Sequence, residues 1–100
     1  MATSKIQSLK ATLGLEIRTV TAEFTIQANG NANTNLKTLI DNNIPSGKKF
    51  LSVAGYSTND VYVVLSACRY GNSAYSLQLR NIATSERTTT VSVDYLCGKV

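Results

Sequence analysis

The side chains that could act as acids, bases or nucleophiles are few in this chain of 100 residues. There are six Asp and Glu residues, two cysteines and no histidine. A hydrolase needs a nucleophile with an activating base, or two carboxylates that face each other. The acids fall in different predicted strands and turns, and no histidine can serve as the base. The sequence therefore predicts a protein that is not an enzyme.

The same inventory argues against a metal or another cofactor. Cys68 and Cys97 are the only thiols, whereas a structural zinc site takes four ligands. Residues 29–35 carry asparagine at alternate positions, as a calcium loop carries its oxygen ligands, but they include no acid. We expect no cofactor and no metal. Two buried, reduced thiols are the favoured interpretation of the cysteines, and a disulfide between neighbouring strands is the alternative.

Tyrosine offers better chemistry for binding than for catalysis. An aromatic face stacks on the apolar side of a sugar ring, while amide and guanidinium groups reach the hydroxyls. Such residues gather around one predicted hairpin turn, which we therefore interpret as a carbohydrate or peptide contact. The alternative is that the two tyrosines of this turn, Tyr70 and Tyr75, cap sheet edges or fill a subunit interface. The candidate binding residues are Arg69, Tyr70, Asn72, Ser73 and Tyr75.

The elements that must position this hairpin are mostly strands. From residue 15 the hydrophobic period is two, as in 20–26, where apolar residues alternate with polar ones. Further strands are predicted at 50–56, 61–70, 75–82 and 88–97, separated by turn-forming residues. Residues 33–44 fit either a short helix or irregular and strand structure. The pattern predicts one all-β domain over residues 15–100, an antiparallel β-sandwich of jelly-roll-like form.

Residues 1–14 are predicted to form a separate N-terminal arm or short helical neck. Ile6, Leu9 and Leu13 are spaced by three and four, as in the seam of a helix or coiled-coil stub. A helix of this length is marginal in water without a partner. The segment is therefore interpreted as the end of a multi-chain neck or an arm docked on a neighbour, with a disordered leader as the alternative.

The predicted strand at 61–70 is apolar on both sides. One side carries Val61, Val63, Leu65 and Ala67 and is assigned to the core. The other side carries Tyr62, Val64, Ser66, Cys68 and Tyr70. An antiparallel sheet in a lone domain normally leaves one face polar, so something should cover this second side.

Two covers are available for it: residues 33–44, or another copy of the chain. The second also provides partners for the seam, so we expect a homo-oligomer, most simply a trimer. Its predicted interface residues are Ile6, Leu9, Leu13, Tyr62 and Val64.

Charge and hydropathy restrict the other partners. The net charge of +4 is scattered, with Lys48–Lys49 as the one adjacent basic pair, so nucleic acid is not the expected partner. A small barrel that binds single strands through Tyr62, Arg69, Tyr70 and Arg80 is kept as an alternative. The longest apolar run, Val63–Leu65, is far too short for membrane insertion.

Several short motifs are similar to those of a known family. They are the turn Pro45-Ser46-Gly47, the strand Val53-Ala54-Gly55-Tyr56, the pair Asn81-Ile82 and the closing strand Val91-Ser92-Val93-Asp94-Tyr95. Over residues 20–97 the chain resembles the C-terminal head domains of phage tail fibres and baseplate receptor-binding proteins. A tail fibre is usually much longer, so the chain departs from that pattern in length.

The resemblance implies a trimeric β-sandwich head behind a fibrous or coiled stalk. Such a head belongs to the virion, is assembled in the host cytoplasm, and attaches to a host-surface glycan or protein. We therefore expect a non-enzymatic virion component that mediates attachment. A purely structural capsid or tail protein is the alternative.

Overall fold

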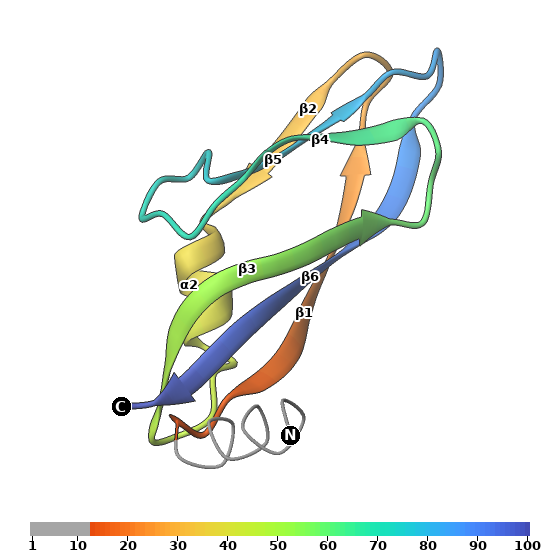
Figure 1. Ribbon diagram of the computed structural model, residues 1–100. Helices are drawn as coiled ribbons and strands as arrows, with labels where there is room; N and C mark the ends of the chain where they lie inside the picture. The colour runs from red at the N-terminus through yellow and green to blue at the C-terminus, as the bar shows by residue number, and fades with distance from the viewer. Residues whose placement is uncertain (1–12) are drawn as a thin grey trace.

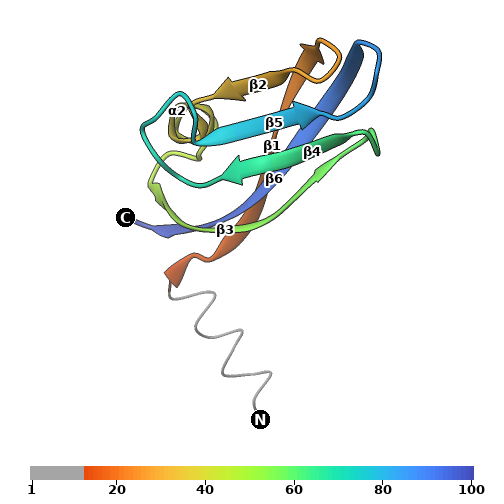
Figure 2. The ribbon, with the colours of Figure 1, turned by 90° about the horizontal axis from the view of Figure 1, so that it is seen from above.

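A computed structural model describes residues 13–100 as two antiparallel sheets packed face to face (Figures 1 and 2). One sheet has the strand order β1-β6-β3 and the other has the order β2-β5-β4. The all-β sandwich predicted from the sequence is confirmed, whereas the predicted neck lies almost entirely outside the described residues. The elements are β1 (Glu16–Ile26), β2 (Asn31–Thr34), α2 (Leu36–Asp41), β3 (Lys48–Thr58), β4 (Val63–Cys68), β5 (Leu77–Asn81) and β6 (Arg87–Lys99).

Strand β6 lies in the middle of the larger sheet and supplies much of the core. Its alternate residues Val91, Val93, Tyr95 and Cys97 are all fully buried. It pairs with β1 on one side and β3 on the other, and both partners are antiparallel to it. The predicted alternation of this strand is therefore confirmed.

The segment at 33–44, which the sequence left open, contains both a strand and a helix. β2 ends at Thr34, and Asn35 then caps α2 by accepting a hydrogen bond of 3.0 Å from the Thr38 amide. The helix buries Leu36 and Ile40 in the core between the sheets. This segment therefore closes the core and does not cover the second side of β4.

The two cysteines are free thiols in different sheets. Cys97 is buried on β6, and Cys68 is half-buried at the end of β4. Burial raises the pKa of the Cys68 thiol because the thiolate would lose hydration. The favoured interpretation of two reduced thiols agrees with this arrangement.

A buried asparagine joins the end of β1 to the connection between β5 and β6, at the end of the sandwich where β6 begins. The Asn81 amide donates hydrogen bonds of 2.9 Å to the carbonyl oxygens of Ile26 and Ser85. Its side-chain oxygen accepts one of 2.9 Å from the Ala83 amide. Asn81 is fully buried, so these backbone groups have no water to replace it.

We expect Asn81→Ala to lower the free energy of unfolding by roughly 2–4 kcal/mol, because it leaves several buried backbone groups without partners. Urea unfolding followed by circular dichroism measures this difference. Asn31→Ala, at an exposed position of β2, is the matched control and should change stability by less than about 0.5 kcal/mol. Equal stabilities of the two variants would contradict the assigned role.

Candidate functional site

The predicted binding residues lie in the connection between β4 and β5, and hydrogen bonds within that connection hold it. The Arg69 amide donates to the Ser76 carbonyl at 2.9 Å, and the Ser76 amide donates to the Ser73 carbonyl at 3.0 Å. The Asn72 side chain accepts a 3.0 Å bond from Asn35, the residue that caps α2. The hairpin is therefore fastened to the helix.

Tyr70 points into the protein and holds the hairpin in place. Its ring stacks on Phe50 with a centroid distance of 3.8 Å and an interplanar angle of 12°. Its hydroxyl donates a hydrogen bond to Asp41 at the end of α2, and the Lys37 ammonium lies 2.7 Å from the same carboxylate. One ring face of Tyr70 is thus occupied by Phe50, and its hydroxyl is already paired.

The electrostatics of this cluster favour the charged carboxylate. The ammonium of Lys37 and then the hydroxyl of Tyr70 hold the pKa of Asp41 below its ordinary value. Burial, followed by the bond to the carboxylate, raises the pKa of Tyr70. The tyrosine therefore stays protonated and continues to donate its hydroxyl proton at neutral pH.

We expect Asp41→Asn to lower stability at neutral pH by less than about 1 kcal/mol, since the ion pair is largely solvated. A carboxyl with a lowered folded-state pKa stabilises the protein above its unfolded pKa of about 3.9 and loses this contribution as the pH falls. The difference from the wild type should therefore shrink between about pH 5 and pH 3. Thermal unfolding across this range measures the effect. A difference that does not depend on pH would contradict the mechanism.

Three of the predicted binding residues are exposed. They are Arg69, Asn72 and Tyr75, of which Tyr75 is 61% exposed. Because the Asn72 side-chain oxygen is already bonded to Asn35, Arg69 and Tyr75 can contact a ligand with the least rearrangement. The structure brings all five into one connection but turns Tyr70 toward the core.

The second side of β4 is arranged differently from the expectation, because the pairing of β4 with β5 shifts between Leu65 and Ala67. A bulge inserts one extra residue and so exchanges the sides of the residues that follow. Cys68 and Tyr70, which were assigned to the outer side, therefore pack against the core. Val61 was assigned to the core and is 87% exposed. Both assignments were wrong.

The outer side of β4 is nevertheless apolar where the strand begins. We call the exposed residues Val61, Tyr62, Val64 and Ile82 the distal patch. The Arg87 guanidinium lies 4.5 Å above the ring of Tyr62 and also approaches Asp60 at 3.6 Å. The predicted interface residues Tyr62 and Val64 thus lie in one exposed area.

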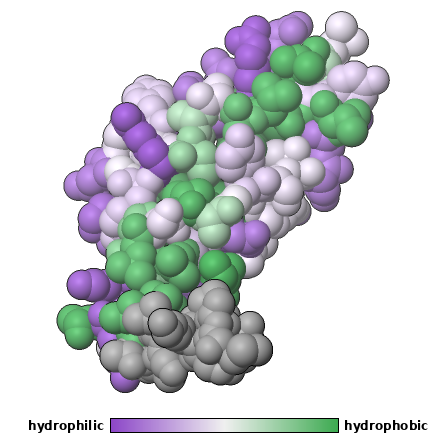
Figure 3. Space-filling model, viewed as in Figure 1, coloured by the Kyte–Doolittle hydropathy of each residue, from purple (hydrophilic) through white to green (hydrophobic). Residues whose placement is uncertain are grey.

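A second exposed apolar area lies where β1 begins and β6 ends. Ile17 and Leu96 face each other across the strand pair, and Leu15 lies opposite Gly98. Gly98 has no side chain, and the Leu51 and Leu15 methyl groups close over it, 3.1 and 3.3 Å from where a Cβ would be. Figure 3 shows hydrophobic surface at this end. We call Leu13, Leu15, Ile17, Leu51 and Leu96 the basal patch.

The two patches lie at opposite ends of β6. Leu13 contacts Gly98 near the last residue of that strand, whereas Arg87, its first residue, covers Tyr62. Thirteen residues of extended strand span about 40 Å. Leu13 therefore lies far from Tyr62 and Val64, and the single predicted interface is divided between two places. The other two interface residues, Ile6 and Leu9, lie outside the described residues.

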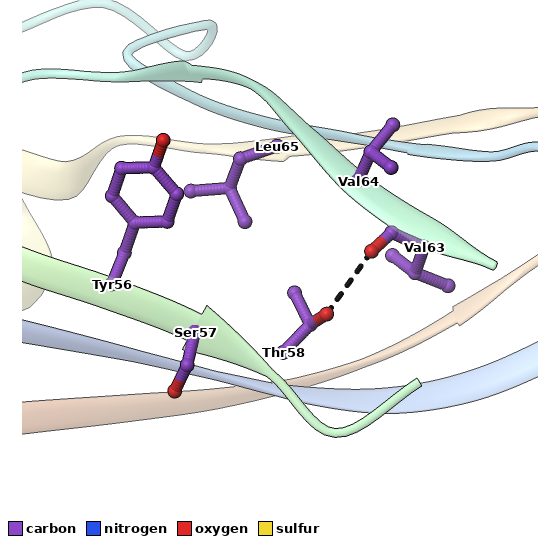
Figure 4. A pocket seen from close by; sticks show the side chains of 6 residues that line it. All are labelled: Tyr56, Ser57, Thr58, Val63, Val64 and Leu65. Carbon is purple, nitrogen blue, oxygen red and sulfur yellow. Dashed lines mark hydrogen bonds between the residues drawn. The ribbon is translucent and has the colours of Figure 1, made fainter. Parts of the chain in front are cut away.

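A groove that the sequence did not reveal runs between β3 and β4 (Figure 4). Two adjoining hollows of about 330 and 180 Å³ share Tyr56 and Leu65, whose side chains point toward each other. The Thr58 hydroxyl donates a 3.0 Å hydrogen bond to the Val63 carbonyl and closes one end. Sequence patterns cannot show this groove, because it forms where two different sheets meet.

The carboxylates do not gather at any of these places. Glu16 pairs with Lys48 at 2.9 Å, Asp94 accepts from Thr19, and Glu86 accepts from Gln27. Within residues 13–100, no group of three or more His, Cys, Asp or Glu side chains could hold a metal ion. No helix in this part of the chain has the length and hydrophobicity needed to cross a membrane.

Comparison with known proteins adds no assignment. No family model, curated protein or solved structure matches this chain. The interpretation of the surfaces therefore rests on their own geometry and chemistry.

Proposed function

We propose that this protein is a non-enzymatic attachment domain that works as a homo-oligomer, most simply a trimer. In this proposal the domain is the head of a phage-type fibre, the family that its motifs resemble, and it is part of the virion. The observation that carries the proposal is the basal patch. Its exposed residues are Leu13, Ile17 and Leu51, and Leu13 belongs to the segment predicted to form a neck.

The residues on the outer face of the β1-β6-β3 sheet have the pattern expected if another copy of the chain covers only the base of that face. Away from the base, the outward residues of β1 and β6 are small and polar or charged, as expected for a face in contact with water. At the base they change to leucine and isoleucine. This change within a single face is typical of a subunit contact. The polar residues are Thr19, Thr21, Glu23, Thr25, Thr88, Thr90, Ser92 and Asp94.

The predicted seam continues this patch. Leu13 is the last residue of the seam Ile6–Leu9–Leu13 and also belongs to the basal patch. Copies associated at their bases would give the seam residues partners and would bury the basal leucines together. The distal patch and the hairpin would remain available to other partners, as in a head that extends from a stalk.

Attachment is assigned to the hairpin that carries Tyr75 and Arg69. An exposed tyrosine ring in the same connection as an exposed arginine, Asn72 and Ser73 suits a shallow contact with a glycan or a peptide. The alternative of a single-strand nucleic-acid barrel has less support. Of its stacking residues, Tyr62 lies under Arg87 and Tyr70 is stacked on Phe50.

Oligomerisation is tested by light scattering coupled to size-exclusion chromatography of the whole chain. We expect about three times the monomer mass of 10.8 kDa for the wild type. The double variant Ile17→Ser/Leu51→Ser should give the monomer mass, because it removes the centre of the basal contact. Val61→Ser, in the distal patch, is the control and should keep the wild-type mass. A monomeric wild type at micromolar concentration would remove the oligomer from the proposal.

Attachment is tested on a glycan array together with whole host-type bacterial cells. We expect binding that Tyr75→Ala reduces by about tenfold or more, since a central aromatic anchor carries much of such a contact. Asn31→Ala, on an exposed strand away from the hairpin, is the control. Binding that survives Tyr75→Ala and Arg69→Ala unchanged would place attachment elsewhere on the molecule.

A further inference from the structure

Both walls of the groove between β3 and β4 are edge strands. β3 is the last strand in the order β1-β6-β3, and β4 is the last in the order β2-β5-β4. Among residues 13–100, no backbone hydrogen bond joins these two strands. An edge strand presents a row of unpaired amide and carbonyl groups, to which another strand can add.

The edge of β3 is regular in the part that lines the groove. Bulges commonly protect edge strands, and those of β3 fall between Phe50 and Gly55. From Gly55 to Thr58 the strand pairs with β6 in continuous register, and this stretch includes the wall of the larger hollow. On the other wall, the Val63 carbonyl is already bonded to the Thr58 hydroxyl. The edge of β3 is therefore the one with more capacity to pair.

The lining of the groove selects an uncharged occupant. Tyr56, Leu65 and Cys68 provide apolar surface, and Thr58 and Ser66 provide hydroxyl groups. No charged side chain lines either hollow, so a charged group entering it would lose water without gaining a partner. Tyr56 is 59% exposed, and its ring and the Leu65 side chain point toward each other, so together they form an apolar surface in the groove (Figure 4).

We propose that the groove binds a short, extended, uncharged segment of a partner protein, which adds as a fourth strand at the β3 edge. The segment pairs with Gly55–Thr58 and packs an apolar side chain against Tyr56 and Leu65. A polypeptide fits because an extended backbone carries alternating donors and acceptors that match those of the edge. The hydroxyl groups of a glycan do not alternate as donors and acceptors with the spacing of a strand edge.

A second copy of the chain fits this site less well than a short segment. Continuous pairing between two β3 strands needs a long regular edge, and the bulges between Phe50 and Gly55 interrupt it. The groove is also separate from the basal patch and from the Tyr75 hairpin. The inference therefore goes beyond the proposed attachment function and does not depend on the oligomeric state.

The probe is an array of end-capped random heptapeptides without Asp, Glu, Lys or Arg, with hits measured in solution by fluorescence anisotropy. We expect a subset of these peptides to bind the intact wild-type protein. Tyr56→Ala should weaken binding by about tenfold or more, because it removes the aromatic wall. Asn31→Ala is the control, since Asn31 is exposed on β2 and belongs neither to the groove nor to the Tyr75 hairpin. Val64→Lys, at an exposed position, brings a charge to the rim without disturbing the core and should also weaken binding.

Amide hydrogen exchange by NMR identifies strand addition directly. A bound peptide should slow exchange at one or more amides within Gly55–Thr58, and the amides of the 69–76 connection should not change. Far-ultraviolet circular dichroism of each variant checks that it is folded.

Four results would overturn the inference. The first is the absence of any binding peptide at millimolar concentration, and the second is peptide binding that Tyr56→Ala and Val64→Lys leave unchanged. The third is glycan binding in the groove that Tyr56→Ala abolishes. The fourth is protection of the Cys68 thiol from alkylation that increases with protein concentration in the absence of peptide. The last result would assign the groove to a second copy. A monomeric wild type that still binds peptides would contradict the proposed trimer and leave this inference intact.

Discussion

The fold depends on the burial of one face of β6. Val91, Val93, Tyr95 and Cys97 are fully buried along this strand, and both neighbours in the larger sheet pair with it. The burial of Val91 and of Val93 contributes about 1.5–3 kcal/mol each. Without this strand β1 and β3 would have no common partner, and the smaller sheet would have no surface on which to pack.

Polar side chains then fix the connections on this core. Asn81 ties the end of β1 to the β5–β6 connection at one end of the sandwich, and Asn35 joins the cap of α2 to the hairpin through Asn72. Tyr70 adds an aromatic stack and a bond to Asp41 on the same helix. The hairpin therefore presents its exposed residues from a supported frame, which lowers the entropy lost when a partner binds.

The exposed surfaces of the molecule differ from one another in their chemistry. The outer faces of the sheets are largely polar, so the basal and distal patches stand out against them. Because they are separated along β6, a partner that covers the basal patch leaves the distal patch exposed. The uncharged groove between the two open edges adjoins the distal patch at Val64 and differs from it because edge strands form its walls.

Local pattern alone determined the strands with regular alternation. Residues 20–26 and 91–97 could be assigned from the sequence because apolar residues repeat every second position, and such a repeat has one face to bury whichever strand lies beside it. The hairpin between β4 and β5 could also be predicted, from the apolar residues of its two strands and the turn residues between them. The sandwich class followed from the number and spacing of these strands.

Only the tertiary structure decided which side chains of β4 face outward. The bulge between Leu65 and Ala67 arises from the pairing of β4 with β5, and it turns Cys68 and Tyr70 toward the core. The distance between Leu13 and Tyr62 and the groove beside Tyr56 likewise depend on how the two sheets are placed on each other. A sequence pattern records which residues alternate along one strand, but it does not record register shifts or the gap between two sheet edges, because these are set by contacts between residues distant in the chain.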